Sequence, residues 1–170
     1  MQVSDSSGGM WRRLRTAAAI AGLCLGLSSG ARANWDLVEQ DLPPLRTQLL
    51  RAAISHVGAG YQLGANGHGK FDCSSLAQTA YRAVGQTLPR TAREMLRVGE
   101  RISYQDALPG DLLLYDWGSQ RHRSLHVMIY LGNDLAIHAS PSARAVEITS
   151  ISRPQWRRHF VAGARILPTS

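Results

Sequence analysis

The order of the sequence patterns predicts an α+β domain in which N-terminal helices pack on one face of an antiparallel β-sheet. Apolar residues recur at helical spacing over 45–57 and 73–84, in the first half of the chain. The second half changes to short apolar runs bounded by turn residues, which is typical of strands. Because helices come first and strands follow, we expect two layers and no parallel α/β sheet.

The first helix is expected from Leu45 to Val57, with Gly58 as its stop. A glycine-rich loop follows over 58–70, and its backbone can approach other groups closely. The loop lacks the Gly-Lys-Ser/Thr ending of a nucleotide-binding phosphate loop.

The second helix is expected over 73–84, with Asp72 as its N-cap and Gly85 after its C-terminus. Thr91 and Glu94 have the spacing of a capping box and predict a third, short helix that ends before Gly99. The predicted strands cover 112–115, 127–131 and 135–139, and two weaker candidates cover 145–148 and 160–166.

The first 33 residues have the pattern of a secretory signal peptide. A basic cluster precedes a small apolar run, and Ala31-Arg32-Ala33 supplies the cleavage pattern. The apolar run is too short to span a membrane, so we expect export without stable membrane insertion after cleavage near Ala33. We expect residues 34–44 to form a short lead-in that lies on the surface, and we expect one domain over 45–170.

The charge balance is mildly basic. The chain has a net charge of +7, and the leader carries +3 of it through four arginines and one aspartate, which leaves +4. Such a domain suits an anionic polymer. The sequence contains no zinc knuckle, aromatic-basic sheet motif or dense basic stripe, so a nucleic-acid partner is not expected.

Cysteine usage singles out Cys73. The chain has two cysteines, and Cys24 is lost with the leader. Exported proteins tend to pair their thiols or avoid them, so a remaining single cysteine indicates a functional thiol. Its position in the first turn of a helix places it near unpaired N–H groups and the positive dipole end, which favour a thiolate nucleophile.

A cysteine nucleophile needs a base and an orienting partner, and His126 and His138 lie in consecutive predicted strands. Side chains alternate between the two faces along a strand. The two histidines therefore share a face only if the numbers of two residues paired across the strands add up to an even value. A two-residue connection gives an odd sum and would place the two rings on opposite faces. A three-residue connection, 132–134, pairs Leu131 with Leu135 and brings the rings together, and we predict this one.

Five segments, together with Tyr61, resemble in chain order the signature blocks of the NlpC-type bacterial cell-wall cysteine peptidases. The resemblance spans about residues 61–139. The segments are Phe71-Asp72-Cys73-Ser74, Leu88-Pro89-Arg90-Thr91, Pro109-Gly110-Asp111-Leu112, His126-Val127-Met128-Ile129-Tyr130-Leu131-Gly132 and Ile137-His138-Ala139.

The resemblance implies a compact papain-like fold and hydrolysis of peptide bonds in the stem peptides of peptidoglycan, without a cofactor. It implies Cys73 as nucleophile, His126 as general base and then acid, and His138 as the orienting group. The signal-peptide pattern, in turn, predicts a periplasmic or secreted location after cleavage near Ala33. A targeting partner is not identified.

Further site residues follow from the same resemblance. Tyr61 is implied beside the nucleophile, where it helps the backbone N–H of Cys73 to stabilise an oxyanion. Asp72 and Ser74 flank the nucleophile and are implied as substrate contacts, although helix capping is the simpler role for Asp72.

The chain departs from the family pattern at three positions. Ser75 and Ala65 stand where glycines are common, and Met128 stands where a small residue usually follows His-Val. We expect Met128 to share a face with His126 and to narrow the cleft. A histidine in the orienting position also brings no fixed negative charge to its partner.

Three alternatives remain at this stage. Cys73, His126 and His138 could form a zinc site with His122, although the sequence favours no metal. The chain could be a non-catalytic wall-binding or regulatory domain with the same fold. The same thiol could also transfer an acyl group to an amine in place of water.

Overall fold

The computed structural model describes residues 42–118 and 124–169. The predicted signal peptide and most of the predicted lead-in lie outside the described residues. Pro44, the last residue of that lead-in, begins the first described helix. None of the helices in the described ranges is long and apolar enough to cross a membrane.

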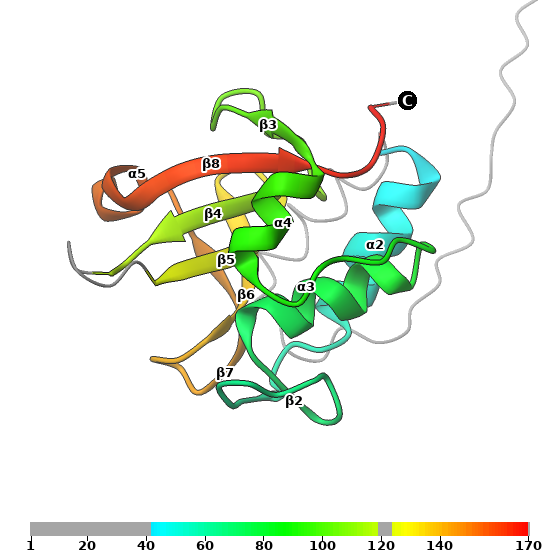
Figure 1. Cartoon of the computed structure of the whole chain (residues 1–170), viewed down its shortest axis with the longest axis vertical. Coiled ribbons are helices and arrows are strands. Elements are labelled where there is room, and N and C mark those ends of the chain that lie inside the picture. Colours follow the sequence, from blue (N-terminus) through cyan, green and yellow to red (C-terminus); the bar gives the residue numbers. More distant parts are fainter. Residues whose placement is uncertain (1–41, 119–123, 170) are drawn as a thin grey trace, which may run out of the picture.

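Four helices and eight strands make up the described part of the chain (Figure 1). The helices are α2 (Pro44–Ile54), α3 (Cys73–Arg82), α4 (Ala92–Val98) and α5 (Pro154–His159). The strands are β1 (Gly60–Tyr61), β2 (Lys70–Phe71), β3 (Glu100–Ile102), β4 (Leu112–Asp116), β5 (Leu125–Gly132), β6 (Leu135–Ser140), β7 (Ala145–Ser150) and β8 (Phe160–Arg165).

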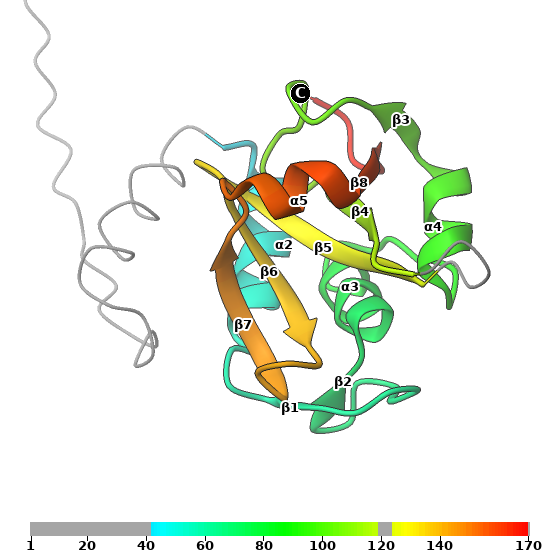
Figure 2. The same ribbon diagram turned by 90° about the vertical axis from the view of Figure 1, so that its left-hand side faces the viewer.

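The strands form one curled sheet in the order β2-β1-β7-β6-β5-β4-β8-β3. Neighbouring strands run antiparallel, except that β1 and β2 run parallel. Figure 2 shows α2 and α3 on one side of this sheet and α5 on the other. The predicted architecture, with N-terminal helices on one face of an antiparallel sheet, is confirmed.

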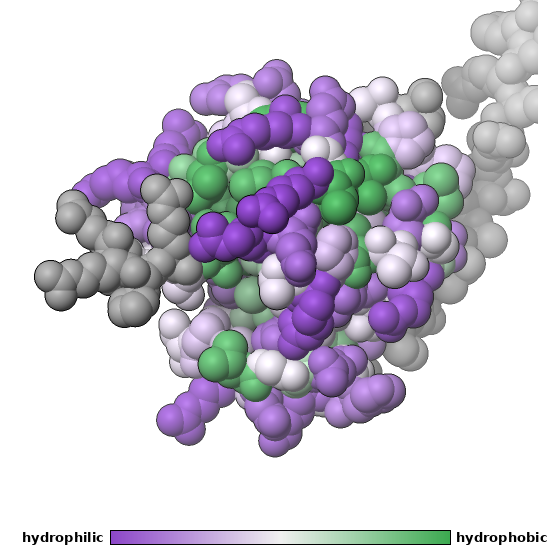
Figure 3. Space-filling model, in the orientation of Figure 1, coloured by the Kyte–Doolittle hydropathy of each residue, from purple (hydrophilic) through white to green (hydrophobic). Residues whose placement is uncertain are grey.

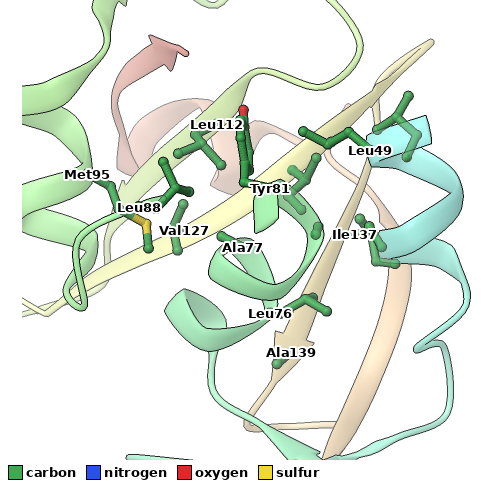
Figure 4. Packing of buried hydrophobic residues seen from close by; sticks show 14 of the residues in the cluster. Leu49, Leu76, Ala77, Tyr81, Leu88, Met95, Leu112, Val127, Ile137 and Ala139 are labelled. Carbon is green, nitrogen blue, oxygen red and sulfur yellow. The ribbon is translucent and has the colours of Figure 1, made fainter. Parts of the chain in front are cut away.

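The main core lies between the three N-terminal helices and the centre of the sheet (Figure 4). Leu49 of α2, Leu76 of α3 and Met95 of α4 are all buried against the strands. From the sheet, residues at alternate positions of β4, β5 and β6 meet them, as the period of two requires. These sheet residues include Leu112, Leu114, Val127, Ile129, Leu131, Ile137 and Ala139.

A second, smaller cluster covers the opposite face, beneath α5. It contains Leu113, Tyr115 and Met128, and Trp156 of α5 packs against it. Met128 does share the sheet face of His126, but it is 1% exposed and does not line the cleft described below. The expectation that Met128 narrows the cleft is therefore wrong, because α5 and its neighbours cover this side chain.

Outside this core, the face shown in Figure 3 is largely hydrophilic, and hydrophobic residues show between the polar ones.

A buried ionic network joins α2 to the C-terminal strand. The carboxylate of Asp111 accepts hydrogen bonds from Arg46 (3.1 Å) and Arg165 (2.8 Å). Arg46 is 2% exposed and also donates to the carbonyl oxygens of Pro109 and Leu167. The network fixes the start of β4, which lies between β5 and β8 in the sheet.

The third helix and its capping box are confirmed, since the Thr91 hydroxyl and Glu94 carboxylate bond each other's backbone N–H groups. The first two helices end two or three residues earlier than predicted. The strands β1, β2 and β3 and helix α5 are not predicted. They have only two to six residues each, too few for a periodic pattern to emerge.

The connection between β5 and β6 differs from the prediction. It is a two-residue turn in which Asn133 and Asp134 have φ of 50° and 56°. An irregularity in β5 leaves Leu131 as an extra residue, so that Gly132, not Leu131, pairs with Leu135. On the far side of this bulge from the turn, the numbers of paired residues again add up to an even value, as in the pair Ile129–Ile137. The predicted three-residue connection is wrong, but the predicted common face is confirmed.

Candidate active site

A cleft of about 490 Å³ opens at the tip of α3. Cys73, His126, His138 and Tyr61 all line it, although the sequence separates them by up to 77 residues. Trp117 and Trp156 form part of its wall. The fold therefore brings together four of the six residues that the sequence analysis assigned to the site.

The start of α3 is held by an N-cap that fixes the position of Cys73. Asp72 Oδ1 accepts a hydrogen bond from the backbone N–H of Ser75 at 2.7 Å. In return, the Ser75 hydroxyl oxygen accepts from the N–H of Asp72 at 3.0 Å. The capping role predicted for Asp72 is confirmed. Ser75, which replaces a common family glycine, completes the reciprocal capping box.

Arg90 braces this cap and was not singled out from the sequence. Its guanidinium donates to Asp72 Oδ2 at 2.6 Å and to the Ser74 hydroxyl oxygen at 2.7 Å. Asp72 and Ser74 are buried in this network and do not line the cleft, so substrate contact by either stays a prediction. Arg90 lies within segment 88–91 of the family resemblance, and this is the sequence feature from which it could have been found.

Although burial raises the pKa of the Asp72 carboxyl, the hydrogen bonds from Arg90, Ser75 and Ser74 outweigh it and leave that pKa below its ordinary value. Asp72 is thus a carboxylate at neutral pH. An anion at this point stabilises the helix N-terminus but opposes a second negative charge on the neighbouring sulfur.

Cys73 is partly exposed and has no disulfide partner among the residues that the structure describes. Burial raises the pKa of its thiol, and the backbone N–H of Val127 is the largest influence in the opposite direction. The charge of Asp72 raises this pKa, and the N–H groups of Ser74 and Cys73 lower it. The net direction is upward, which differs from the thiolate expected at a helix tip. We infer a neutral thiol at rest, surrounded by donors that can receive negative charge.

His126 and His138 are in direct contact across the sheet. His126 Nε2 lies 2.7 Å from His138 Nδ1, and the two rings are nearly perpendicular. Since this contact occupies His126 Nε2, its Nδ1 is the ring nitrogen left for the thiol. The backbone pairing of β5 with β6 ends at Ile129–Ile137, short of both histidines.

Both imidazoles are neutral at physiological pH. Burial lowers the pKa of His126 to about 3, with a further contribution from His138. Burial also lowers the pKa of His138 to about 4. A neutral imidazole can accept the proton of a neutral thiol, which is the state a general base requires.

Tyr61 lies at the end of β1 beside the nucleophile. Burial raises the pKa of its hydroxyl, and the nearby Cys73 and Asp72 raise it further. The hydroxyl therefore remains protonated and can donate a hydrogen bond into the cleft.

The aromatic wall of the cleft is braced by several ring contacts. Trp117 stacks on His159 with ring centroids 4.1 Å apart and meets Trp156 edge to face. His159 Nδ1 in turn lies 2.9 Å from the carbonyl oxygen of Asp116. Trp117 is 43% exposed, so it presents an apolar surface to a bound molecule.

Within residues 42–118 and 124–169, no group of three or more histidine, cysteine or acidic side chains could hold a metal ion. His122, the fourth ligand of the zinc alternative, lies outside the described residues.

The comparison with family models decides the classification. The model of the NlpC/P60 family matches residues 58–165, which contain every residue of the cleft named above. The chain belongs to the NlpC/P60 family. Its α+β architecture is that of the solved members.

Individual relatives agree with this classification. The murein DD-endopeptidase/LD-carboxypeptidase MepS of Escherichia coli is 34% identical over 114 residues, which are 66% of this chain and 58% of MepS. An NlpC/P60 protein of Bacillus cereus is 27% identical with a TM-score of 0.67, over 76% of this chain and 43% of that one. The chain spans 58% of the length of MepS and 22% of the length of the probable endopeptidase p60 of Listeria welshimeri.

One solved relative carries a different description. RipD of Mycobacterium tuberculosis is described as a non-catalytic NlpC/p60 domain protein adapted to peptidoglycan binding. It is 25% identical with a TM-score of 0.56, over 74% of this chain and 99% of that one. The family thus includes a member described as non-catalytic.

Proposed function

We propose that this protein is a cysteine endopeptidase that hydrolyses peptide bonds in the stem peptides or cross-links of peptidoglycan. One observation carries the proposal. The cleft contains a thiol at a capped helix tip and two neutral histidines whose rings contact each other at 2.7 Å. The names of relatives such as MepS supply the substrate class.

In the first half of the reaction, His126 Nδ1 accepts the proton of the Cys73 thiol as Sγ attacks the carbonyl carbon of the substrate. The backbone N–H of Cys73 and the Tyr61 hydroxyl donate hydrogen bonds to the oxyanion. The imidazolium then donates its Nδ1 proton to the leaving amine. The C–N bond breaks, and a thioester on Cys73 remains.

In the second half, His126 Nδ1 accepts a proton from water as the water oxygen attacks the thioester carbonyl. Collapse of the tetrahedral intermediate breaks the C–S bond and releases a carboxylic acid. The imidazolium returns its proton to the sulfur. His138 holds the His126 ring through Nε2 during both halves, which leaves Nδ1 as the ring nitrogen that exchanges protons with the sulfur.

We also propose that the protein is exported and acts in the periplasm or outside the cell. The basic and apolar pattern of residues 1–33 supports export, with cleavage near Ala33. The net charge of +4 on the remainder supports attraction to an anionic wall polymer.

Incubation of the purified protein with isolated peptidoglycan tests this function. We expect soluble fragments with a new amine and a new carboxylate within stem peptides, identified by mass spectrometry. Added chelator is not expected to change their release. Tight sedimentation with peptidoglycan and no fragments supports the alternative, a non-catalytic wall-binding domain of the kind that RipD is described to be.

A further inference from the structure

One buried polar atom beside the proposed catalytic pair lacks a hydrogen bond. His138 is 5% exposed, and its Nε2 has no hydrogen-bond partner among the described residues. An unpaired ring nitrogen at this depth is costly. The nearest charged oxygen is Oε1 of Glu147, 3.5 Å away.

The sheet register places Glu147 in this position. In the antiparallel pair of β6 and β7, His138 is directly opposite Glu147. Directly opposed side chains project to the same face, so the carboxylate must lie on the side of the two histidines. The Glu147 side chain is 41% exposed and can rotate. A small rotation closes the 3.5 Å separation to hydrogen-bond length.

We propose that Glu147 is a positioning residue that fixes the protons of both histidines. This inference rests on the proposed function, because it adds a fourth member to the Cys73–His126–His138 arrangement. The carboxylate accepts only, so it requires a proton on His138 Nε2.

The rest of the proton order follows from that requirement. A neutral His138 with its proton on Nε2 has a bare Nδ1, which must accept from His126 Nε2. A neutral His126 with its proton on Nε2 has a bare Nδ1, which is ready to accept the thiol proton. The reverse order places a proton on His126 Nδ1 and leaves no base for the thiol. Without Glu147, the 2.7 Å contact permits both orders.

The carboxylate has a second effect, on the imidazolium that forms when the thiol loses its proton. The titratable groups that line the cleft with the histidine pair are Cys73 of α3 and Tyr61 of β1. On the neighbouring strands, Glu147 of β7 lies opposite His138, and Tyr115 of β4 lies opposite His126. The guanidinium of Arg157 on α5 lies over the Tyr104 ring, and His159 bonds the backbone of Asp116. Glu147 is thus the negative group that faces His138 directly.

Imidazole NMR of ¹⁵N-histidine-labelled protein tests the proton order without any substrate. In the wild type, we expect both His126 and His138 to carry the proton on Nε2 at pH 7.5. In Glu147→Ala, both rings should show mixed tautomers. Glu147→Gln can still accept through its amide oxygen and should keep the wild-type pattern. A His138 protonated on Nδ1 in the wild type overturns the proposal.

Kinetics on a soluble stem peptide provide the second readout. For Glu147→Ala, we expect kcat to fall about tenfold with KM within about twofold. Glu147→Gln should lose less, and in both variants the limb of the pH profile that reports the imidazole should move to lower pH. Glu100→Gln, the same chemical change at an exposed position on β3, is the matched control and should leave both unchanged.

The two readouts separate this inference from the proposed function. Wild-type protein with the expected tautomers and no hydrolysis contradicts the function but not the positioning by Glu147. An active wild type whose tautomers, kcat and pH profile are unaffected in Glu147→Ala contradicts the positioning but not the function.

Discussion

At the scale of single residues, burial sets the protonation of the histidine pair. Because the pKa of His126 is lowered to about 3 and that of His138 to about 4, both rings stay neutral at pH values where an exposed histidine is charged. The base therefore remains available in mildly acid solution, and the pH dependence of hydrolysis should show it.

We predict that kcat/KM for a stem peptide changes little between pH 7 and pH 5. A lowered pKa means that the imidazole accepts a proton from solvent only at lower pH, so the half-maximal point of the acid limb should lie below pH 5. Initial rates across a pH series give this value, and circular dichroism at each pH confirms that the protein is folded. A half-maximal point near pH 6.5 contradicts the burial of the pair.

The sequence identifies the nucleophile and both histidines as candidates because their residue types and segments are distinctive. It does not identify Arg90 or Glu147 as site residues. Arginine and glutamate are common on protein surfaces. The role of Arg90 arises from a contact with Asp72, 18 residues earlier in the chain, and the role of Glu147 arises from the pairing of β6 with β7. The sign of the Cys73 pKa shift is also missed, because it depends on burial in the folded chain.

At the scale of elements, the capped start of α3 positions the thiol. Asp72 accepts hydrogen bonds from Ser75, Gly64 and Arg90, and thereby joins the helix to the glycine-rich loop and to the segment before α4. A capped helix end is an ordinary stabilising feature. Here it also determines where the sulfur lies relative to the sheet.

We predict that Asp72→Ala lowers the free energy of unfolding by about 1–3 kcal/mol, because it removes the cap and leaves Arg90 without its partner. Hydrolysis at a temperature where the variant is folded should fall by about tenfold, since the sulfur is no longer held in place. Urea unfolding and initial rates measure the two effects.

Thr91→Ala is the matched control for this variant, since Thr91 caps α4 by the same chemistry at an exposed position. It should lose about 0.5–1 kcal/mol of stability and no activity. An equal loss of activity in both variants argues against a positioning role for Asp72.

Element prediction succeeds where patterns are long or capped and fails where strands are short. The Thr91–Glu94 box predicts α4 from Ala92 to Val98, and the apolar periods predict α2 and α3. The bulge at Leu131 is not predictable from local sequence, because a two-residue turn and a three-residue loop share the same Gly-Asn-Asp residues.

At the scale of the whole molecule, the Asp111 network connects α2 to β8. Asp111 is 1% exposed and bonds both Arg46 and Arg165, which are 119 residues apart. The segment 109–112 is part of the family resemblance, yet Asp111 lies in this network and does not line the cleft. We interpret its role as structural.

We predict that Asp111→Ala lowers the free energy of unfolding by about 3–5 kcal/mol, because two buried or half-buried guanidinium groups lose their counter-charge. Denaturant unfolding measures this value. Asp106→Ala, which removes an exposed carboxylate from the preceding turn, should cost less than about 1 kcal/mol. A loss in Asp111→Ala no larger than that in the control contradicts the structural role.

The most direct test of the whole account is fragment release from peptidoglycan by Cys73→Ala, measured beside the wild type. If the sulfur of Cys73 forms the thioester, the variant should release stem-peptide fragments at least about 10³-fold more slowly while its melting temperature stays close to that of the wild type. Release of the same fragments at the wild-type rate by a folded Cys73→Ala protein contradicts the account.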